Sequence, residues 1–156
     1  MAHRHSRIHV ACIVIFLTPI SLGFAAEPTR SLSQVNWDRD VREAWQEARQ
    51  NDRPLLVYVT MDSCIYCEKM KKTTLQDRRV LSDLQTYFTP VSLNVKEAPD
   101  LVQLLMIKSF PSTVVIQTDG DVIESIAGYQ TSRQLRQRLR LTLQQVAQEQ
   151  RDSHTR

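Results

Sequence analysis

The stretch that decides the fold is LLVYVTMDSCIYCEKM, which spans residues 55–70. Residues 55–60 form a continuous apolar run of strand length, which suits a central strand covered on both faces. Residues 61–63 predict a short loop, and Cys64 begins a helical stretch that continues through Lys72. The sequence therefore predicts a buried strand that leads through a short loop into a helix that starts with a cysteine pair.

Two cysteines with this spacing at a helix start can close a small disulfide ring, and their surroundings differ. Cys64 lies beside the unpaired N–H groups and the positive dipole end of the helix, which stabilise its thiolate. Cys67 lies one turn into the helix, where a less exposed thiol can attack a mixed disulfide and release the product. The pattern favours thiol–disulfide exchange, with Cys64 as the nucleophile and Cys67 as the resolving residue.

Other uses of the cysteine pair remain open. A zinc site needs more ligands, but after residue 25 the chain has no second CxxC and only one histidine, His154. Met61 and Met70 flank the cysteines and could complete a soft copper site, although helical methionines more often fill a core. The pair could also be a purely structural disulfide. If it is redox-active, the exchange needs no metal, nucleotide or flavin, because the cysteines themselves carry the electrons.

The rest of the chain alternates predicted helices and strands. Strands separated by helices imply parallel neighbours, and Asp119-Gly120 predicts a hairpin that adds an antiparallel edge. We therefore expect an α/β fold with a mixed central sheet of about four to five strands, flanked by helices in three α/β/α layers. The other predicted elements are a helix from Asp40 to Asn51, a short helix capped by Asp77, a strand over 88–95, a helix opened by Pro99, strands over 113–117 and 122–127, and a long helix capped by Thr131.

The N-terminal residues indicate an export signal. Residues 1–9 are basic, residues 10–24 are almost wholly apolar, and small residues follow, as in a secretory signal peptide cut after Ala25. The apolar run is shorter than a membrane span and contains Pro19. Cys12 lies at the front of this run, without the preceding hydrophobic segment of a lipoprotein signal, so we expect it to be discarded. The expected location is the periplasm or the cell exterior, with no stable membrane insertion after cleavage.

Cleavage would also lower the charge of the chain. Removal of Arg4 and Arg7 from the 20 basic residues leaves 18 against 17 acidic ones, which does not favour nucleic acid as a partner. The expected organisation is a removed signal peptide at 1–25, a flexible lead at 26–36, a domain at 37–147 and a frayed tail at 148–156.

A second informative feature, a proline, precedes the third predicted strand. Pro111 follows the aromatic Phe110 and stands directly before the strand, which makes it a candidate cis-proline, with an ordinary loop proline as the alternative. Taken together, the strand, the CxxC at a helix start, and Pro-Ser-Thr before a hairpin and a final helix resemble the thioredoxin superfamily over roughly residues 37–143. Residues 62–70, DSCIYCEKM, resemble exported thioredoxin-like proteins related to the C-terminal domain of the transmembrane thiol:disulfide interchange reductase.

This resemblance implies roles for residues beyond the cysteines. In the family, the cis-proline pairs with an extended substrate backbone beside the sulfurs, a role that falls on Pro111. Phe110 would help to shape the substrate groove, and Ile65 and Tyr66, between the cysteines, would contact the substrate and tune the reduction potential.

The chain departs from the family pattern in the first strand. The buried acid of the family aligns with Tyr58, and the lysine that partners it aligns near Ser92. Because that acid is usually assigned to proton transfer at the resolving cysteine, the route of this proton is left open. The candidates are Asp62, Tyr66, Glu68 or a water molecule.

The resemblance implies an exported thiol–disulfide oxidoreductase. It favours reduction of substrate disulfides over oxidation of substrate thiols. Its partners would be protein thiols and disulfides as substrates and a membrane or soluble thiol as electron donor or acceptor. The alternative is a non-catalytic binding module of the same fold that holds copper or client proteins. The arginine-rich face of the last helix predicts a solvated surface, with a docking surface for an acidic partner as the alternative; its members are Arg133, Arg136, Arg138 and Arg140.

Overall fold

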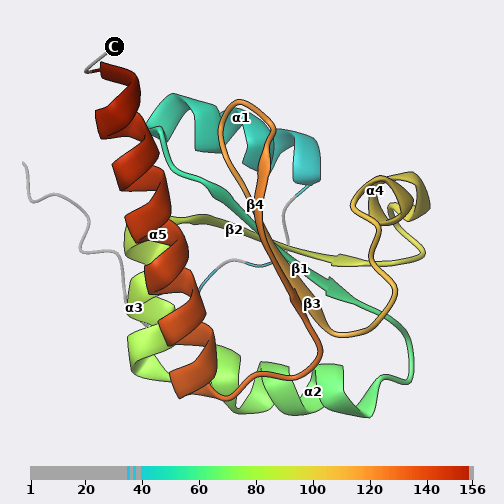
Figure 1. The fold of residues 1–156 in the computed structure, drawn as a ribbon. Coiled ribbons are helices and arrows are strands. Elements are labelled where there is room, and N and C mark those ends of the chain that lie inside the picture. The colour runs from blue at the N-terminus through green and yellow to red at the C-terminus, as the bar shows by residue number, and fades with distance from the viewer. Residues whose placement is uncertain (1–34, 36, 38–39, 155–156) are drawn as a thin grey trace, which may run out of the picture. The chain divides into compact units, whose positions relative to one another are not determined.

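The computed structural model describes residues 35, 37 and 40–154 (Figure 1). The predicted signal peptide, Cys12 and all of the predicted lead except Val35 lie outside these residues. The elements in chain order are α1 (Val41–Asn51), β1 (Leu55–Thr60), α2 (Ile65–Lys72), the 3₁₀ helix η1 (Thr74–Gln76), α3 (Arg78–Tyr87), β2 (Thr89–Asn94), α4 (Pro99–Leu104), β3 (Ser112–Ile116), β4 (Val122–Ala127) and α5 (Ser132–His154).

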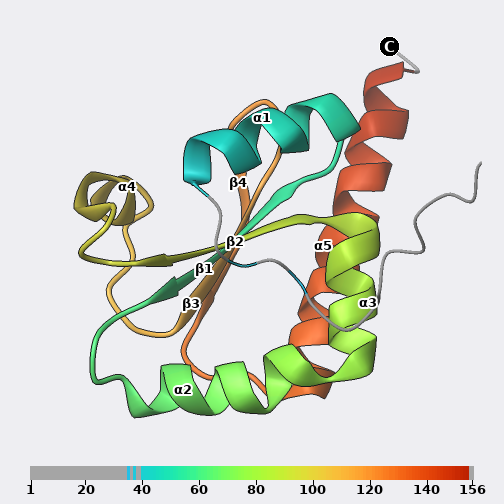
Figure 2. The same cartoon turned by 180° about the vertical axis from the view of Figure 1, so that it is seen from behind.

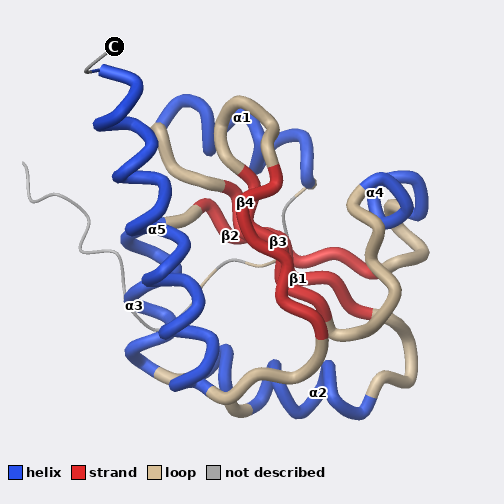
Figure 3. The backbone as a smooth tube through the Cα atoms, viewed as in Figure 1, coloured by secondary structure: helices blue, strands red, loops and turns tan. Residues whose placement is uncertain are grey.

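The four strands form one mixed sheet in the order β2-β1-β3-β4. β1 pairs with β2 in parallel and with β3 antiparallel, and β3 and β4 form the antiparallel hairpin (Figure 3). All six residues of β1 are buried, as expected for a central strand with helices on both faces. The sequence-based prediction of a mixed α/β sheet is confirmed, with four strands.

Helices cover both faces of the sheet, which gives the predicted three layers (Figures 1 and 2). Alternate residues of β1 point to opposite faces and join two separate apolar clusters. The first cluster joins the sheet to α2, α3 and α5 and includes Leu56, Tyr58, Met70, Leu84, Val115, Leu135 and Leu139. The second joins the sheet to α1 and α4 and includes Ala44, Ala48, Val57, Val59, Val91, Val102 and Val114.

Polar side chains begin the helices where the sequence predicts it. The carboxylate of Asp40 accepts a hydrogen bond from the backbone N–H of Arg42 at 2.7 Å, at the start of α1. Thr131 and Gln134 form a reciprocal capping box at the start of α5: the Thr131 N–H donates to the Gln134 amide oxygen at 2.9 Å, and the Gln134 N–H donates to the Thr131 hydroxyl at 3.4 Å. These contacts fix where each helix leaves the preceding loop.

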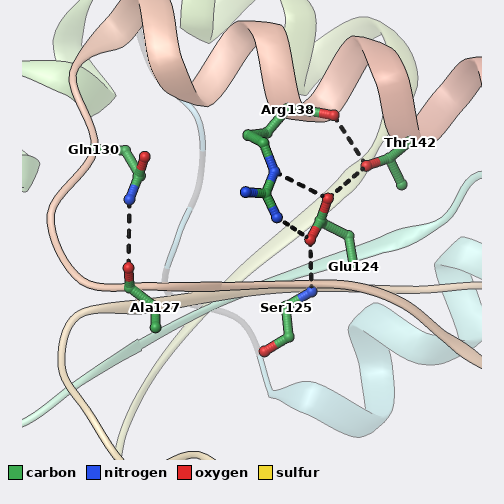
Figure 4. Close-up of polar contacts among 6 residues, drawn as sticks. All are labelled: Glu124, Ser125, Ala127, Gln130, Arg138 and Thr142. Carbon is green, nitrogen blue, oxygen red and sulfur yellow. Dashed lines mark hydrogen bonds and ion pairs between the residues drawn. The ribbon is translucent and has the colours of Figure 1, made fainter.

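A charged network fixes α5 to the edge strand β4 (Figure 4). The Glu124 carboxylate accepts hydrogen bonds from Arg138 Nη2 at 2.6 Å and from Arg138 Nε at 3.2 Å. It also accepts from the backbone N–H of Ser125 at 3.1 Å, and the Thr142 hydroxyl lies 3.4 Å from its second oxygen. The Thr142 hydroxyl has a single proton and lies closer to the Arg138 carbonyl, at 3.0 Å, so the two-pronged contact with Arg138 is the main one. Arg138 therefore has a structural role in joining helix and sheet.

The structure differs from the sequence-based prediction at both ends of the domain. Helix α5 continues to His154, past Gln148 where we expected fraying, because residues 148–154 contain no glycine or proline and are polar residues that a helix tolerates. Val35, within the predicted lead, is buried in the first apolar cluster, since its side chain finds an apolar surface there. The carbonyl of Trp37 accepts a hydrogen bond from the backbone N–H of Ser92 at 3.0 Å, which joins this segment to β2. None of the helices in the described part of the chain is both long enough and apolar enough to cross a membrane.

Candidate active site

The site lies where β1 ends and α2 begins. Ser63 has a positive φ of 56°, a left-handed turn that redirects the chain from the strand into the helix. Cys64 is extended and forms the N-cap of α2, where its Sγ accepts a hydrogen bond from the backbone N–H of Cys67 at 3.1 Å. A cysteine sulfur therefore occupies the place that a serine or aspartate oxygen usually takes at a helix start.

Cys64 and Cys67 are joined by a disulfide bond across a sequence separation of 3. Cys64 is partly exposed, whereas Cys67 is only 2% exposed. This is the asymmetry that the sequence predicts: an accessible sulfur at the helix N-terminus and a sheltered sulfur one turn further on. The oxidised pair is what dithiol–disulfide exchange leaves after it reduces a substrate.

Tyr58 lies beneath the resolving position. Its side chain is 1% exposed, and its hydroxyl donates a hydrogen bond to the backbone carbonyl oxygen of Cys67 at 3.1 Å. Burial, and secondly the negative charge of Glu68, raise the pKa of Tyr58 far above its ordinary value. Tyr58 therefore stays protonated at neutral pH and acts as a hydrogen-bond donor. It pairs with Ser92 in the β1–β2 register, so a neutral pair fills the two positions where the family pattern has an acid and a lysine.

An open groove of about 690 Å³ runs beside the two sulfurs. Polar side chains from the loop after β1, from α2 and from the end of β2 line it together with the cysteines. Its lining residues are Thr60, Met61, Asp62, Ser63, Cys64, Ile65, Cys67, Glu68, Lys71 and Asn94. Of the proposed replacements for the family's acid, Asp62 and Glu68 lie in this groove and Tyr66 does not.

The two carboxylates of the groove differ in their contacts. Asp62 accepts hydrogen bonds from Lys96 Nζ at 2.5 Å and from Asn94 Nδ2 at 2.7 Å, and these two contacts lower the pKa of the Asp62 carboxyl. Glu68 has only a loose ion pair, with its Oε1 4.0 Å from Lys71 Nζ. Asp62 is therefore engaged by its partners, whereas the Glu68 carboxylate is the more available proton acceptor in the groove.

Sequence reasoning did not identify Asn94 and Lys96 as part of this site. They are 32 and 34 residues from Asp62 along the chain and carry no motif. The parallel β1–β2 register, which pairs Thr60 with Asn94, brings the end of β2 to the loop that follows β1. Only the strand order could have revealed this contact.

The two residues between the cysteines are exposed, but they face different surroundings. Ile65 is 81% exposed and lines the groove. Tyr66 is 60% exposed, and its ring centroid lies 6.4 Å from that of Tyr129. The Lys69 ammonium also contacts the Tyr129 ring, 4.7 Å from its centroid. Tyr66 is thus on the side of α2 that faces the loop before α5.

The Phe110-Pro111 peptide bond is cis, the isomer expected from the sequence. Pro111 is buried, and its carbonyl accepts a hydrogen bond from the backbone N–H of Gly128 at 2.7 Å. Because Val59 pairs with Ser112, Pro111 lies at the same end of the sheet as the loop that leads to Cys64. The side chain of Phe110 is half-buried and packs against the apolar cluster under α1 and α4.

The two methionines of the copper alternative lie in different surroundings. Met70 has an exposed fraction of 0% and belongs to the core cluster under α2, whereas Met61 lines the groove and is 44% exposed. Within residues 35, 37 and 40–154, no group of three or more histidine, cysteine, aspartate or glutamate side chains could hold a metal ion. Met70 therefore acts as a core residue.

A mixed sheet between two helical layers, with a CxxC disulfide at the start of a helix, is the arrangement of the thioredoxin fold. The family model described as a thioredoxin-like domain matches residues 41–142, and the chain belongs to this family. Fold and disulfide together support thiol–disulfide oxidoreductase activity.

Solved structures share this fold. A thioredoxin from Thermus thermophilus is 23% identical, with a TM-score of 0.61, covering 66% of this chain and 83% of that chain. The DsbH oxidoreductase is 19% identical, with a TM-score of 0.55 and coverage of 69% and 86%. The oxidised DsbD C-terminal domain of Neisseria meningitidis is 20% identical, with a TM-score of 0.51 and coverage of 60% and 84%. At these identities the likeness shows a common fold.

A curated relative matches part of the chain. The uncharacterized protein B0495.5 of Caenorhabditis elegans is 26% identical over 72 residues, which cover 46% of this chain and 10% of that protein. The chain therefore spans about a tenth of the length of this relative.

Proposed function

We propose that this protein is an exported thiol–disulfide oxidoreductase that reduces disulfides in other proteins through Cys64 and Cys67. The observation that carries the proposal is the disulfide at the N-terminus of α2, with one accessible and one sheltered sulfur. Export is supported by the sequence pattern of residues 1–25. The reductase direction is supported by the resemblance of residues 62–70 to relatives of the interchange reductase.

The reaction begins with the reduced protein. The Cys64 thiolate attacks a substrate disulfide, forms a mixed disulfide with one substrate sulfur and releases the other as a thiolate. The Cys67 thiol then loses its proton and attacks the Cys64 sulfur, which breaks the mixed disulfide and releases the second substrate sulfur. Two electrons have passed to the substrate, and Cys64 and Cys67 are left as the disulfide seen in the structure. A thiol donor restores the dithiol by the same steps in reverse, so the cycle needs no metal, nucleotide or flavin.

The local structure of α2 favours the first step. The backbone N–H of Cys67 already donates to the Cys64 sulfur at 3.1 Å, and the positive end of the helix dipole adds to this interaction. In the reduced protein, both interactions favour a thiolate over a neutral thiol. Cys64 is therefore the attacking residue.

The second step needs a proton acceptor near Cys67. Tyr58 is protonated and donates to the Cys67 carbonyl, and Asp62 is engaged by Asn94 and Lys96. Glu68 lines the same groove as Cys67, so we assign the proton to its carboxylate through a water molecule in the groove. Glu68 thereby takes over the step that a buried acid performs in the family pattern.

Substrate contacts surround the accessible sulfur. The exposed side chains of Ile65 and Tyr66 follow Cys64 on α2, with Ile65 in the groove and Tyr66 beside Tyr129, and provide apolar area for a polypeptide substrate. Pro111 lies at the same end of the sheet and is assigned to the substrate backbone. Phe110, which is half-buried and packs against the second apolar cluster, is assigned to holding the Pro111 segment in place.

Two cysteine variants test the mechanism. Cys64→Ser should abolish turnover, whereas Cys67→Ser should trap mixed disulfides that are visible on a non-reducing gel and disappear with reductant. Full activity of the Cys64→Ser protein would overturn the mechanism. Client binding that is indifferent to both substitutions would instead favour a non-catalytic binding module.

The reduction potential of the pair tests the direction. Alkylation and mass analysis across thiol/disulfide buffers should give a value near that of thioredoxin, about −270 mV, if the protein is a reductase. A value near about −120 mV would indicate an oxidant that donates disulfides. A value below about −300 mV with slow exchange would indicate a structural bond.

A further inference from the structure

A second groove, separate from the disulfide, lies between the start of α3 and the first turns of α5. These two helices lie side by side in both views (Figures 1 and 2) and make direct contacts. The groove has a volume of about 510 Å³ and shares no lining residue with the groove at the sulfurs. It is lined by Asp77, Arg79, Ser132, Arg133, Arg136, Gln137, Arg140, Leu141 and Gln144.

Acidic side chains neutralise only part of this groove. The Asp83 carboxylate accepts hydrogen bonds from Arg136 Nε at 2.6 Å and from Arg136 Nη2 at 3.4 Å. The Asp77 carboxylate accepts from the backbone N–H groups of Arg79 and Val80, at 2.8 and 3.3 Å, and so caps α3. Asp77, which lines the groove, and Asp83, which pairs with Arg136 of its lining, are therefore already engaged by structural partners.

Three guanidinium groups remain available. In the described part of the chain, Arg79, Arg133 and Arg140 have no acidic side chain within ion-pair distance. The segment of α5 from Ser132 to Gln148 contains no acidic residue that could pair with them at helical spacing. Arg136 and Arg140, four residues apart on one helix, repel each other at a cost in helix stability. A bound anion would remove this cost.

The spacing of the arginines favours an extended chain of carboxylates over a small anion. Arg133 and Arg140 are seven residues apart, so they emerge from α5 about 10 Å apart along its axis. In an extended polyproline II segment, residues three apart lie on the same side, about 9 Å from each other. Glutamates or aspartates at that spacing would each meet one guanidinium, which binds carboxylates in a two-pronged geometry.

The rest of the groove suits a polypeptide. Gln137 and Gln144 offer amide donors and acceptors along the same face of α5, and Leu141 is 50% exposed beside them. Arg79 approaches from α3 on the other side of the groove. We propose that this arginine groove binds an extended acidic segment of a partner protein, with carboxylates at every third residue.

The test measures peptide binding to the full chain by fluorescence anisotropy. The probe is a labelled peptide of about 12 residues with glutamate at every third position, and a scrambled peptide of equal charge is compared with it. We expect the ordered peptide to bind more tightly than the scrambled one, with an affinity that falls as salt rises. The triple substitution Arg79→Gln, Arg133→Gln, Arg140→Gln should weaken binding about tenfold or more, since each exposed ion pair contributes modestly.

The matched control removes the same charge elsewhere. Arg42→Gln, Arg49→Gln, Lys108→Gln changes exposed cations outside the groove and should leave the affinity nearly unchanged. Equal losses in the two triple variants would overturn the proposal, because only net charge would then matter. If the groove triple variant does not fold, as judged by circular dichroism, Arg140→Gln alone should still lower the affinity severalfold, and no change would overturn the proposal.

Two further probes distinguish the occupant. Inorganic phosphate and vesicles of anionic phosphatidylglycerol should compete weakly, and stronger binding of either than of the ordered peptide would show that the assigned partner is wrong. The Cys64→Ser protein should bind the peptide as the unchanged protein does. Peptide binding is therefore separable from the redox proposal.

Discussion

The hydroxyl of Tyr58 in the central strand donates a hydrogen bond to the backbone carbonyl of Cys67, 3.1 Å away in the first turn of α2. This contact joins the sheet to the helix directly beneath the resolving sulfur. The rings of Trp37 and Tyr58 form an edge-type aromatic pair, with their centroids 5.9 Å apart. The position is thus filled by a neutral donor that is held in place by packing.

The first prediction concerns the role of this hydroxyl. Tyr58→Phe should lower the free energy of unfolding by about 1 kcal/mol, because one buried hydrogen bond is lost while the ring still packs. The rate of thiol–disulfide exchange at neutral pH should change by less than about threefold, since a protonated tyrosine is no base there. Urea unfolding and stopped-flow exchange measure the two quantities. A large loss of rate with unchanged stability would show that Tyr58 itself transfers the proton.

The second prediction uses the raised pKa of Tyr58. Its folded-state value lies above that of the unfolded chain, about 10, so its contribution to stability is present below that pH. The contribution is lost as the pH rises toward the folded-state value, because the unfolded state releases the proton first. Unfolding experiments in strong alkali should therefore show a smaller loss of stability in Tyr58→Phe than in the unchanged protein. Parallel curves of the free energy of unfolding against pH for the two proteins would contradict this expectation.

The third prediction addresses the proton acceptor. Glu68→Gln should slow the attack by Cys67 at least about threefold near neutral pH, because the carboxylate in the groove is lost. The difference should disappear above about pH 9, where free thiols ionise without help. The matched control is Asp62→Asn, which removes the other carboxylate of the groove and should have the smaller effect. Decay of a preformed mixed disulfide, followed from about pH 6 to about pH 10, gives the rate profile, and identical profiles of the variant and the unchanged protein would assign the proton to bulk water.

The fourth prediction concerns the start of α3. Burial raises the pKa of the Asp77 carboxyl, but hydrogen bonds from the backbone N–H groups of Arg79 and Val80, together with the Ser132 hydroxyl and the charge of Arg136, outweigh it, and the net shift is downward. The charged cap therefore stabilises the protein above the unfolded-state pKa of about 3.9, and this contribution is lost as the pH falls through the lower folded-state value. Asp77→Ala should cost about 1 kcal/mol at neutral pH and less in acid. Asp77→Asn, whose amide can cap the helix but does not titrate, should lower the free energy of unfolding less than Asp77→Ala does. A loss of stability in Asp77→Ala that does not depend on pH would refute the role of the charged cap.

The fifth prediction tests the network that joins α5 to β4. Glu124→Gln and Arg138→Met should each lower stability by about 1 kcal/mol or less, because the pair is two-pronged but partly exposed. In the double variant the two losses should not add, since both remove the same contact (Figure 4). A thermodynamic cycle from chemical unfolding at low and high salt measures the coupling. Additive losses would mean that the contact contributes nothing.

Much of the fold could be predicted because local patterns agree with the tertiary structure. The apolar run of 55–60, the caps at Asp77 and Thr131 and the hairpin turn at Asp119-Gly120 each specify one element. Strand ends shifted by one residue, as in β3, which begins at Ser112 and ends at Ile116. Where a strand begins and ends depends on which of its backbone groups pair with the neighbouring strand. The sequence of one segment does not reveal this pairing.

The site was predictable where its chemistry depends on local spacing and not where it depends on strand order. The positions of Cys64 and Cys67 on α2 follow from their own segment. The contacts of Asp62 with Asn94 and Lys96 required the parallel pairing of β1 with β2. The packing of the half-buried Phe110 side chain against the second apolar cluster was also not predicted, since an aromatic side chain before a proline can point either way.

The disulfide closes a ring between residues only three positions apart, and this limits what the bond can do for the fold. A cross-link lowers the conformational entropy of the unfolded chain by an amount that grows with the logarithm of the number of residues in the closed loop. A ring this small therefore lowers that entropy little. The two apolar clusters on either side of the sheet supply the cohesion instead. Opening and closing the bond is therefore a change within one helical turn. The sheet and its two apolar clusters stay the same from one turnover to the next.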